Sequence, residues 1–413
     1  MSRTDATSPA APSGGRARER KQRAVVQLLG DGPLSRAEIA RRLAISPTTA
    51  SSLVADLVGA GVAREDEWDA RVERGRGRPA RTVSLRAHGT VVGLDVGRTH
   101  LSAALATRDG EVVAEREERL PLGHSGADTA PVALALIDAL LSETGHRDDL
   151  VSIGVGLPGP VERSSHTVGA GTILSGWVGF DLAHALGRRF EVPASADNDA
   201  NLGMLAEARW GVAQGVSDAV YVKVSTGVGS GMVLGGRLHR GAGGTAGELG
   251  HTPLVPDGAL CRCGNRGCLE TVTSVPAVLD LLRPALGPDL TVEQVLTAAR
   301  AGDPVCRRMM EDVGRHLGRG IALLCNLVDP ELVVLGGPLV AAGEPFLDAV
   351  RAALHRAAIP SVSRRVRVEA TALGGRTEVL GALALALETA PEPRLPASAT
   401  AAGRHERTVR TTG

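Results

Sequence analysis

Residues 246–270 of the chain read AGELGHTPLVPDGALCRCGNRGCLE. This stretch supplies one imidazole and three thiolates close together in the sequence, from His251, Cys261, Cys263 and Cys268. Four such ligands complete a tetrahedral zinc shell without an open position, and a closed shell is structural rather than catalytic. The spacing therefore predicts a structural Zn2+ site, with free buried thiols as the alternative.

Two polar residues upstream of this stretch follow a predicted strand. Asn198 and Asp199 end that strand and open a helix. A carboxylate at this place can take a proton from an alcohol as a general base, and it serves equally well as a helix N-cap. The residues alone leave both interpretations of Asp199 open.

Three glycine-rich turns are candidates for phosphate binding, because exposed backbone amides can surround an anion. They are Asp95-Val96-Gly97-Arg98-Thr99, Thr226-Gly227-Val228-Gly229-Ser230-Gly231 and Gly336-Gly337. The third turn follows a predicted strand, at the edge of the sheet where ligands collect in α/β folds. For the second turn, an ordinary tight hairpin is the alternative.

Apolar segments of strand length alternate with helical segments from residue 91 onward, which predicts α/β layers. We expect strands at residues 91–96, 101–107, 112–119, 151–157, 192–197, 219–224, 231–234, 332–335 and 366–370. We expect helices at residues 130–144, 200–210, 274–282, 292–301, 305–327, 345–357 and 377–388. Cys306 and Cys325 fall on the longest helix and are expected to be small core residues.

The front of the chain has a pattern typical of a helix-turn-helix. Ser35-Arg36-Ala37-Glu38 has the form of a capping box, and Ser46-Pro47 supplies an N-cap and a first helical residue for a second helix. Short polar side chains near the start of that helix suit contacts with base edges and phosphates in a major groove. The candidates are Ser46, Thr48, Thr49, Ser51 and Ser52.

Two strands at about residues 61–64 and 82–85 would complete a winged domain. Between them, Arg76 and Arg78 belong to a Gly-Arg-Gly-Arg-Pro run that can present guanidinium groups to a minor groove or to phosphates. Residues 1–90 carry 16 basic and 10 acidic side chains, a net charge of +6, which favours an anionic partner. The alternative for the helix pair is a structural helical hairpin, and the alternative for the arginine run is a solvated loop. The occurrence of the helix pair and the arginine run in one unit favours binding of operator DNA.

Taken together, these motifs resemble the ROK family of repressors, open reading frames and sugar kinases over about residues 20–388. The strongest matches are residues 246–251 and the loop 261–270, and residues 154–160 (GVGLPGP) are also similar. The helix-turn-helix front end resembles the regulator branch of the family. The resemblance implies a two-lobed actin-like ATPase fold of the ribonuclease H-like kind, with a sugar in the cleft between the lobes.

The resemblance also implies roles for single residues. Asp199 would be the catalytic base of a kinase, and His251 would use one ring nitrogen for zinc and the other for the sugar. The residues implied to hydrogen-bond sugar hydroxyls are Asn198, Asp199, Glu248, His251 and Glu270. Those implied to meet a nucleotide are Asp95, Gly97, Thr99, Thr226, Gly227, Gly229, Gly336 and Gly337.

The phosphate turns depart from the kinase pattern. Arg98 and Ser230 stand where glycine is common in the kinases, and His100 stands where lysine is frequent. Since a side chain at Arg98 would crowd a phosphate, ATP and Mg2+ are doubtful ligands. We expect a sugar-responsive transcriptional repressor of carbohydrate metabolism genes, whose effector is a sugar or sugar phosphate. An ATP-dependent sugar kinase, similar to glucokinases or N-acetylhexosamine kinases, is the alternative, and a DNA-binding protein with a mere dimerisation scaffold is a third interpretation.

The 413 residues are enough for two or three domains. We expect a disordered lead (1–20), a winged helix-turn-helix (21–87), a small lobe (88–198 with 376–388), a large lobe (199–375) with the zinc loop (251–270), and a disordered tail (389–413). No apolar run approaches the ~18 residues of a membrane span, and the first 20 residues lack the apolar core of a signal peptide. We therefore expect a cytoplasmic protein. Binding of a winged helix-turn-helix to two half-sites of operator DNA predicts a homodimer or homotetramer.

Overall fold

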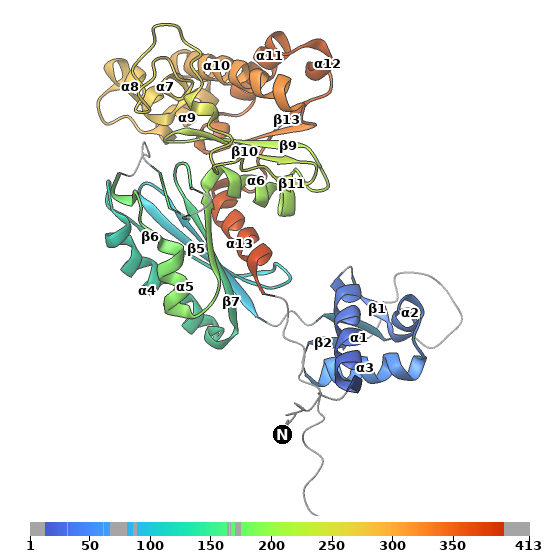
Figure 1. Ribbon diagram of the computed structural model, residues 1–413. Helices are drawn as coiled ribbons and strands as arrows, with labels where there is room; N and C mark the ends of the chain where they lie inside the picture. The colour runs from blue at the N-terminus through green and yellow to red at the C-terminus, as the bar shows by residue number, and fades with distance from the viewer. Residues whose placement is uncertain are drawn as a thin grey trace, which may run out of the picture. The chain divides into compact units, whose positions relative to one another are not determined.

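The computed structural model describes residues 13–30, 32–60, 62–66, 81–85, 89–162, 165, 167–169 and 175–391. The chain divides into two compact units, with the boundary between His88 and Gly89. Figure 1 shows the first unit as helices around a small sheet and the second as a larger body with two sheets.

In its described residues, the first unit combines three helices with a three-stranded antiparallel sheet of order β1-β3-β2. Its elements are α1 (Ser13–Gly30), β1 (Leu34–Ser35), α2 (Arg36–Arg42), α3 (Pro47–Gly59), β2 (Ala63–Asp66) and β3 (Thr82–Leu85). Ser35 and Glu38 form the predicted capping box at α2, and the Ser46 hydroxyl accepts a hydrogen bond from the Thr49 amide at the start of α3. Both predicted helix starts are thus confirmed.

The core of the first unit draws apolar side chains from all three helices and from β3. The fully or almost fully buried residues are Val25, Leu29, Ile39, Leu53, Leu57 and Val83. Because α2 and α3 bury their apolar faces in this core, their outward faces carry the polar side chains.

The expectation of a disordered lead over residues 1–20 is wrong for its second part, because α1 begins at Ser13. The apolar face of α1 starts only near Val25, so the polar segment before it gave no helical signal. Its partner lies on α3, where Arg18 contacts Asp56 at 2.5 Å and Ser52 at 2.8 Å. A contact across 38 residues of sequence is not visible in the local pattern.

The first sheet of the second unit has the order β6-β5-β4-β7-β8. Strands β4 to β6 are antiparallel neighbours, whereas β7 and β8 run parallel to β4. The strands are β4 (Thr90–Val96), β5 (His100–Thr107), β6 (Val112–Arg119), β7 (Leu150–Leu157) and β8 (Ala194–Asn198). Helices α4 (Gly126–Thr144) and α5 (Leu182–Phe190) bury Ile137 and Leu186 against one face of this sheet. No helix was expected at α5, which is only nine residues long.

The second sheet has the order β11-β10-β9-β12-β13, with β9, β12 and β13 parallel. Its strands are β9 (Ala219–Val224), β10 (Val228–Leu234), β11 (Arg237–Leu238), β12 (Leu332–Gly336) and β13 (Arg367–Ala370). One face is covered by α7 (Glu270–Thr273), α8 (Val275–Leu286), α9 (Val292–Ala301), α10 (Pro304–Val328), α11 (Glu344–Ala357) and α12 (Pro360–Ser363). Cys306 and Cys325 are buried in this core, as expected.

Two helices lie between the sheets, α6 (Asp199–Trp210) and α13 (Thr377–Thr389). In Figure 1, α13 (red) runs along β7, and α6 lies next to β10 and β11. Leu383 of α13 packs on Val91 and Ala104 of the first sheet. Gly154 of β7 permits this approach, since a Cβ there would stand 2.0 Å from the carbonyl oxygen of Ala382. We call the first sheet with α4, α5 and α13 the first lobe, and the second sheet with α6 to α12 the second lobe.

Within the described part of the chain, every helix is too short or too polar to span a bilayer.

Candidate functional site

A pocket of about 410 Å³ lies between the two lobes of the second unit. Its walls come from the turn after β4, the segment after β7, the start of α6, the β9–β10 turn and the segment 248–270. The five residues implied to hold a sugar all line it: Asn198, Asp199, Glu248, His251 and Glu270. Segments far apart in the sequence thus bring these side chains together.

The start of α6 places Asn198 and Asp199 in different roles. Asn198 is the N-cap, because its side-chain oxygen accepts hydrogen bonds from the amides of Ala200 at 2.9 Å and Asn201 at 3.3 Å. Its side-chain nitrogen donates to the carbonyl of Gly159 at 2.8 Å, which orients the side chain. The N-cap interpretation therefore belongs to Asn198, and Asp199, the first helical residue, keeps a carboxylate oxygen free of the cap.

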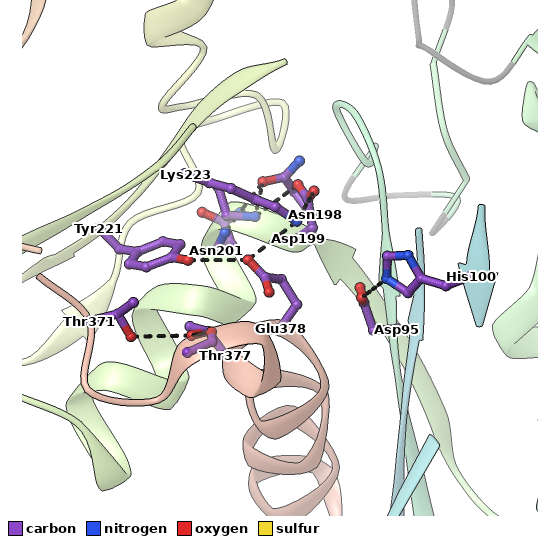
Figure 2. Close-up of polar contacts among 12 residues, drawn as sticks. Asp95, His100, Asn198, Asp199, Asn201, Tyr221, Lys223, Thr371, Thr377 and Glu378 are labelled. Atoms are coloured by element: carbon purple, nitrogen blue, oxygen red, sulfur yellow. Dashed lines mark hydrogen bonds and ion pairs between the residues drawn. The ribbon is translucent and has the colours of Figure 1, made fainter. Parts of the chain in front are cut away.

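That oxygen meets a residue that sequence reasoning did not assign to the site. Lys223 of β9 places its Nζ 2.9 Å from Oδ2 of Asp199 and 3.2 Å from Oε1 of Glu378 on α13. The same Glu378 oxygen accepts a hydrogen bond from the hydroxyl of Tyr221 at 3.1 Å. Figure 2 shows these groups converging from β9, α6 and α13. The signal in the sequence was a lysine inside the otherwise apolar strand AVYVKV.

Glu248 stands in an acidic part of the pocket. Burial, together with the negative charges of Asp199 and Glu270, raises the pKa of Glu248 to about 7. Its Oε2 lies 3.7 Å from Nε2 of His251. On the other side, Glu270 is held by Arg262 through an ion pair of 2.6 Å. Carboxylates held in this way can accept hydrogen bonds from the hydroxyls of a polar ligand.

Four potential metal ligands converge beneath the pocket. The ligand atoms of His251, Cys261, Cys263 and Cys268 all lie within 4.8 Å of one another. The sulfurs of Cys263 and Cys268 are 3.7 Å apart, and the Cys261 sulfur is 3.5 Å from Nδ1 of His251. A tetrahedral ion with zinc–sulfur bonds of ~2.3 Å separates its sulfurs by ~3.8 Å, so the cluster fits a metal ion of this size.

The imidazole of His251 connects this cluster with the pocket. Its Nδ1 faces the Cys261 sulfur, and its Nε2 faces Glu248 and the pocket. A metal ion bound at Nδ1 would fix both the ring orientation and the tautomer.

The predicted phosphate turns border the same pocket, through Gly97, Thr99, Thr226, Gly227 and Gly229. At two of the glycine positions, Gly97 and Gly336, protein side chains fill the space where a Cβ would stand. A Cβ on Gly97 would stand 2.0 Å from the His100 ring, and one on Gly336 would stand 2.0 Å from the Tyr221 hydroxyl. Gly337 adjoins Pro338 of the pocket wall, and Asp95 lies behind the first turn, 3.3 Å from Nε2 of His100.

The three departures from the kinase pattern, at Ser230, Arg98 and His100, now have structural settings. The hydroxyl of Ser230 donates to the carbonyl of Gly247 at 2.8 Å, so this side chain ties β10 to the 246–251 segment and does not face the turn. Arg98 lines the pocket. The hydrogen bond to Asp95 raises the pKa of His100, and so favours its cationic form.

The candidate DNA-contacting side chains lie on the first two turns of α3. Thr48 and Ser52 are exposed, Thr49 and Ser51 are half-buried, and Ser46 is occupied as the N-cap. The hydroxyl of Ser52 accepts a hydrogen bond from Arg18. Arg76 and Arg78 lie outside the described residues.

The family sequence model of ROK proteins matches residues 91–389. The chain belongs to the ROK family. It is 28% identical over 374 residues to a xylose repressor from Caldicellulosiruptor bescii, covering 87% of this chain and 93% of that relative.

Solved ROK structures show the same fold. A ROK-family transcriptional regulator, described as a homologue of the E. coli Mlc protein, matches with a TM-score of 0.73 and 26% identity, over 90% of this chain and 96% of that one. A ROK-family glucokinase from Streptomyces griseus, solved with glucose and AMPPNP, matches with a TM-score of 0.64 and 30% identity, over 73% of this chain and 100% of that one. The expected two-lobed actin-like fold is confirmed, and the regulators match more of this ROK chain than the kinase does.

Proposed function

We propose that this ROK protein is a sugar-responsive, DNA-binding transcriptional repressor of carbohydrate metabolism genes. The observation that carries the proposal is the joining of a winged helix-turn-helix unit to a ROK body with a polar pocket. The similarity to a xylose repressor across 87% of the chain supports it, because that match is longer than the ROK region alone.

The first unit would hold operator DNA. Its α3 presents exposed Thr48 near its start, as a recognition helix in a major groove requires. Arg36 stabilises that helix from behind, because it donates to the Ser51 carbonyl at 3.1 Å and pairs with Glu65 of β2 at 2.5 Å. We expect a homodimer or homotetramer to bind two half-sites, with Arg76 and Arg78 adding contacts to the minor groove or to phosphates.

The pocket would hold a sugar through its hydroxyls. Asn198, Asp199, Glu248 and Glu270 offer amide and carboxylate groups, and His251 adds a ring nitrogen. Zn2+ on His251 and the three cysteines would be structural, because four protein ligands leave no position for substrate. What it would supply is a fixed imidazole at the pocket wall.

Repression would respond to sugar through differential affinity. If the sugar is an inducer, it must bind the arrangement of the protein that releases DNA more tightly than the arrangement that holds it. A sugar with equal affinity for both would change nothing, however tightly it bound.

An ATP-dependent sugar kinase is the second candidate, and Asp199 in the pocket favours it. A general base must reach the alcohol proton, and this carboxylate faces the pocket that the sugar would enter. The similarity to a glucokinase solved with glucose and AMPPNP supports the same idea. Against it stand the departures at Arg98 and His100, which line the phosphate side of the pocket.

One set of measurements separates the two candidates. The purified protein is titrated onto a fragment of its own promoter with xylose, glucose, N-acetylglucosamine and their 6-phosphates, and fluorescence anisotropy reports DNA binding. In parallel, MgATP is added with each sugar and ADP release is measured. We expect at least one sugar to change the DNA affinity by about tenfold or more, as coupling energies of ~1–3 kcal/mol produce. Rapid ADP release, together with DNA binding that no sugar alters, would refute the repressor.

A further inference from the structure

The only two lysines of the chain are Lys21 and Lys223, and the second lies at the junction of the lobes. The side chain of Lys223 is only 19% exposed, on a strand whose other residues are apolar and fully buried. Its basic charge is therefore costly unless anionic partners compensate for the lost hydration.

More than one anionic partner surrounds Lys223. Burial lowers the pKa of Lys223, but the negative charges of Asp199, Glu378 and Asp95 outweigh burial and raise this pKa above its ordinary value. Lys223 therefore remains a cation. The carboxylate of Glu378 is buried, and burial raises its pKa, an effect that the charge of Lys223 opposes.

Asp95 is a further buried carboxylate at this site, which also indicates that the site favours positively charged groups. Its side chain is only 7% exposed, and its Oδ1 has no hydrogen-bond partner within the described chain. The other carboxylate oxygen contacts His100. Carboxylate oxygens are the ligands that Mg2+ and Ca2+ prefer. Here the basic groups that contact the three carboxylates are Lys223 and His100 of the protein itself.

We propose that Lys223 is a positioning residue, a fixed counter-ion that orients the Asp199 carboxylate toward a bound sugar and excludes a divalent cation from the carboxylates of Asp199 and Glu378. The inference rests on the sugar site of the proposed function. In this arrangement the pocket would recognise a sugar without a metal-bound nucleotide, because the ammonium group of Lys223 lies between Asp199 and Glu378.

Tyr221 and Gly336 help to hold this arrangement. The Tyr221 hydroxyl donates to the Glu378 oxygen that also meets Lys223, and Gly336 leaves the space that the hydroxyl requires. With its second partner fixed in this way, the ammonium group has little freedom to leave Asp199.

The test compares Lys223→Ala, Lys223→Arg and wild type in the full-length protein. Isothermal titration with the sugar that responds in the DNA assay gives the affinity, and electron paramagnetic resonance of added Mn2+ counts bound ions. We expect Lys223→Ala to weaken sugar binding by about tenfold to a hundredfold, the range for a lost charged hydrogen bond. Lys223→Arg should restore most of the affinity, and Lys223→Ala should bind one additional Mn2+.

Lys21→Ala is the matched control, since it removes the other lysine from an exposed position on α1 and should leave both readouts unchanged. The cysteine–histidine cluster is common to all variants, so any Mn2+ held there cancels. Unchanged sugar affinity in Lys223→Ala would overturn the positioning role, as would an equal loss in Lys223→Arg. The absence of an additional Mn2+ would overturn the exclusion of metal.

Two provisions keep the test decisive. If Lys223→Ala does not fold, the double variant Lys223→Ala/Glu378→Gln removes the more buried of the two carboxylates that Lys223 compensates. Its sugar affinity should still fall, because Asp199 has lost its partner. If wild type binds no sugar, the proposed function fails, whereas the Mn2+ comparison still tests Lys223 by itself.

Discussion

Among single residues, Glu207 illustrates how a buried charge shapes stability. Its side chain lies inside the second unit, where it accepts hydrogen bonds from the amide of Val212 at 2.9 Å and from the hydroxyl of Thr371. Burial raises the pKa of Glu207, and the two hydrogen bonds only partly oppose this. The folded protein thus holds a proton more tightly than the unfolded chain does.

Because the pKa of Glu207 is higher in the folded protein than in the unfolded chain, its contribution to stability depends on pH. The contribution of Glu207 is complete below the ordinary glutamate pKa and is lost as the pH rises through the raised folded value. Glu207→Gln should therefore gain thermal stability relative to wild type as the pH rises above the ordinary glutamate pKa of about 4.5. Melting curves by circular dichroism across this range test it, with exposed Glu111→Gln as the control. A difference in melting temperature that stays constant with pH would contradict the prediction.

The sequence identified some pocket residues and not others, for a physical reason. Asn198, Glu248 and Glu270 were implied by the resemblance to the ROK family, because they belong to motifs that are local in the sequence. The pairing of Lys223 with Glu378, which lies behind the pocket lining, depends on the fold bringing β9 and α13 together. Local patterns carry no information about such distant partners.

At the scale of elements, the loop 251–270 is the feature most dependent on a ligand. Its bridges pair Pro253 with Cys268 and Leu260 with Arg266, and much of the loop otherwise lacks regular structure. A bound metal would hold the four ligands together and thereby position His251 and Glu270 at the pocket.

Removal of one ligand should therefore affect both metal and sugar. If the proposed zinc site is occupied, Cys263→Ala should lower the metal content to nearly none and weaken sugar binding by about tenfold, because His251 loses its fixed orientation. Native mass spectrometry and calorimetry measure the two effects. Cys306→Ala, on α10 and away from the loop, should keep the zinc. Full zinc content in Cys263→Ala would disprove the ligand assignment.

The sequence predicted the bounds of some strands and helices more accurately than those of others. The buried strands β4, β7 and β9 lie within a residue of the expected ranges, because runs of buried apolar residues give a strong signal. The polar first half of α1 was missed, since its stability comes from contacts such as Arg18 with Asp56.

For the whole molecule, the division into two units predicts that DNA and sugar binding can be perturbed separately. Each unit has its own buried core, so a substitution in the pocket of the second unit need not disturb the fold of the first unit. Asp199→Asn should leave the DNA affinity unchanged in the absence of sugar. A loss of DNA binding in this variant would contradict the modular organisation.

Salt provides the complementary test at this scale. DNA binding through phosphates releases counterions, so the logarithm of the association constant should fall linearly with the logarithm of salt concentration, by about 0.9 for each phosphate contact. Fluorescence anisotropy titrations at about 50 to 300 mM NaCl measure this slope. Binding of an uncharged sugar over the same range should change little. A flat DNA response would exclude phosphate contacts by the first unit.

The position of α13 has a consequence for how the protein is made. This helix covers Val91 and Ala104 of the first sheet on one side and Leu202 of α6 on the other, although it is the last helix described. While the ribosome is still translating the preceding segments, the sheet that was synthesised early has an apolar face with nothing to cover it. The first sheet and α6 cannot complete their buried surfaces before residues 377–389 emerge. A premature stop codon ahead of them would therefore yield an aggregation-prone product rather than a smaller working protein.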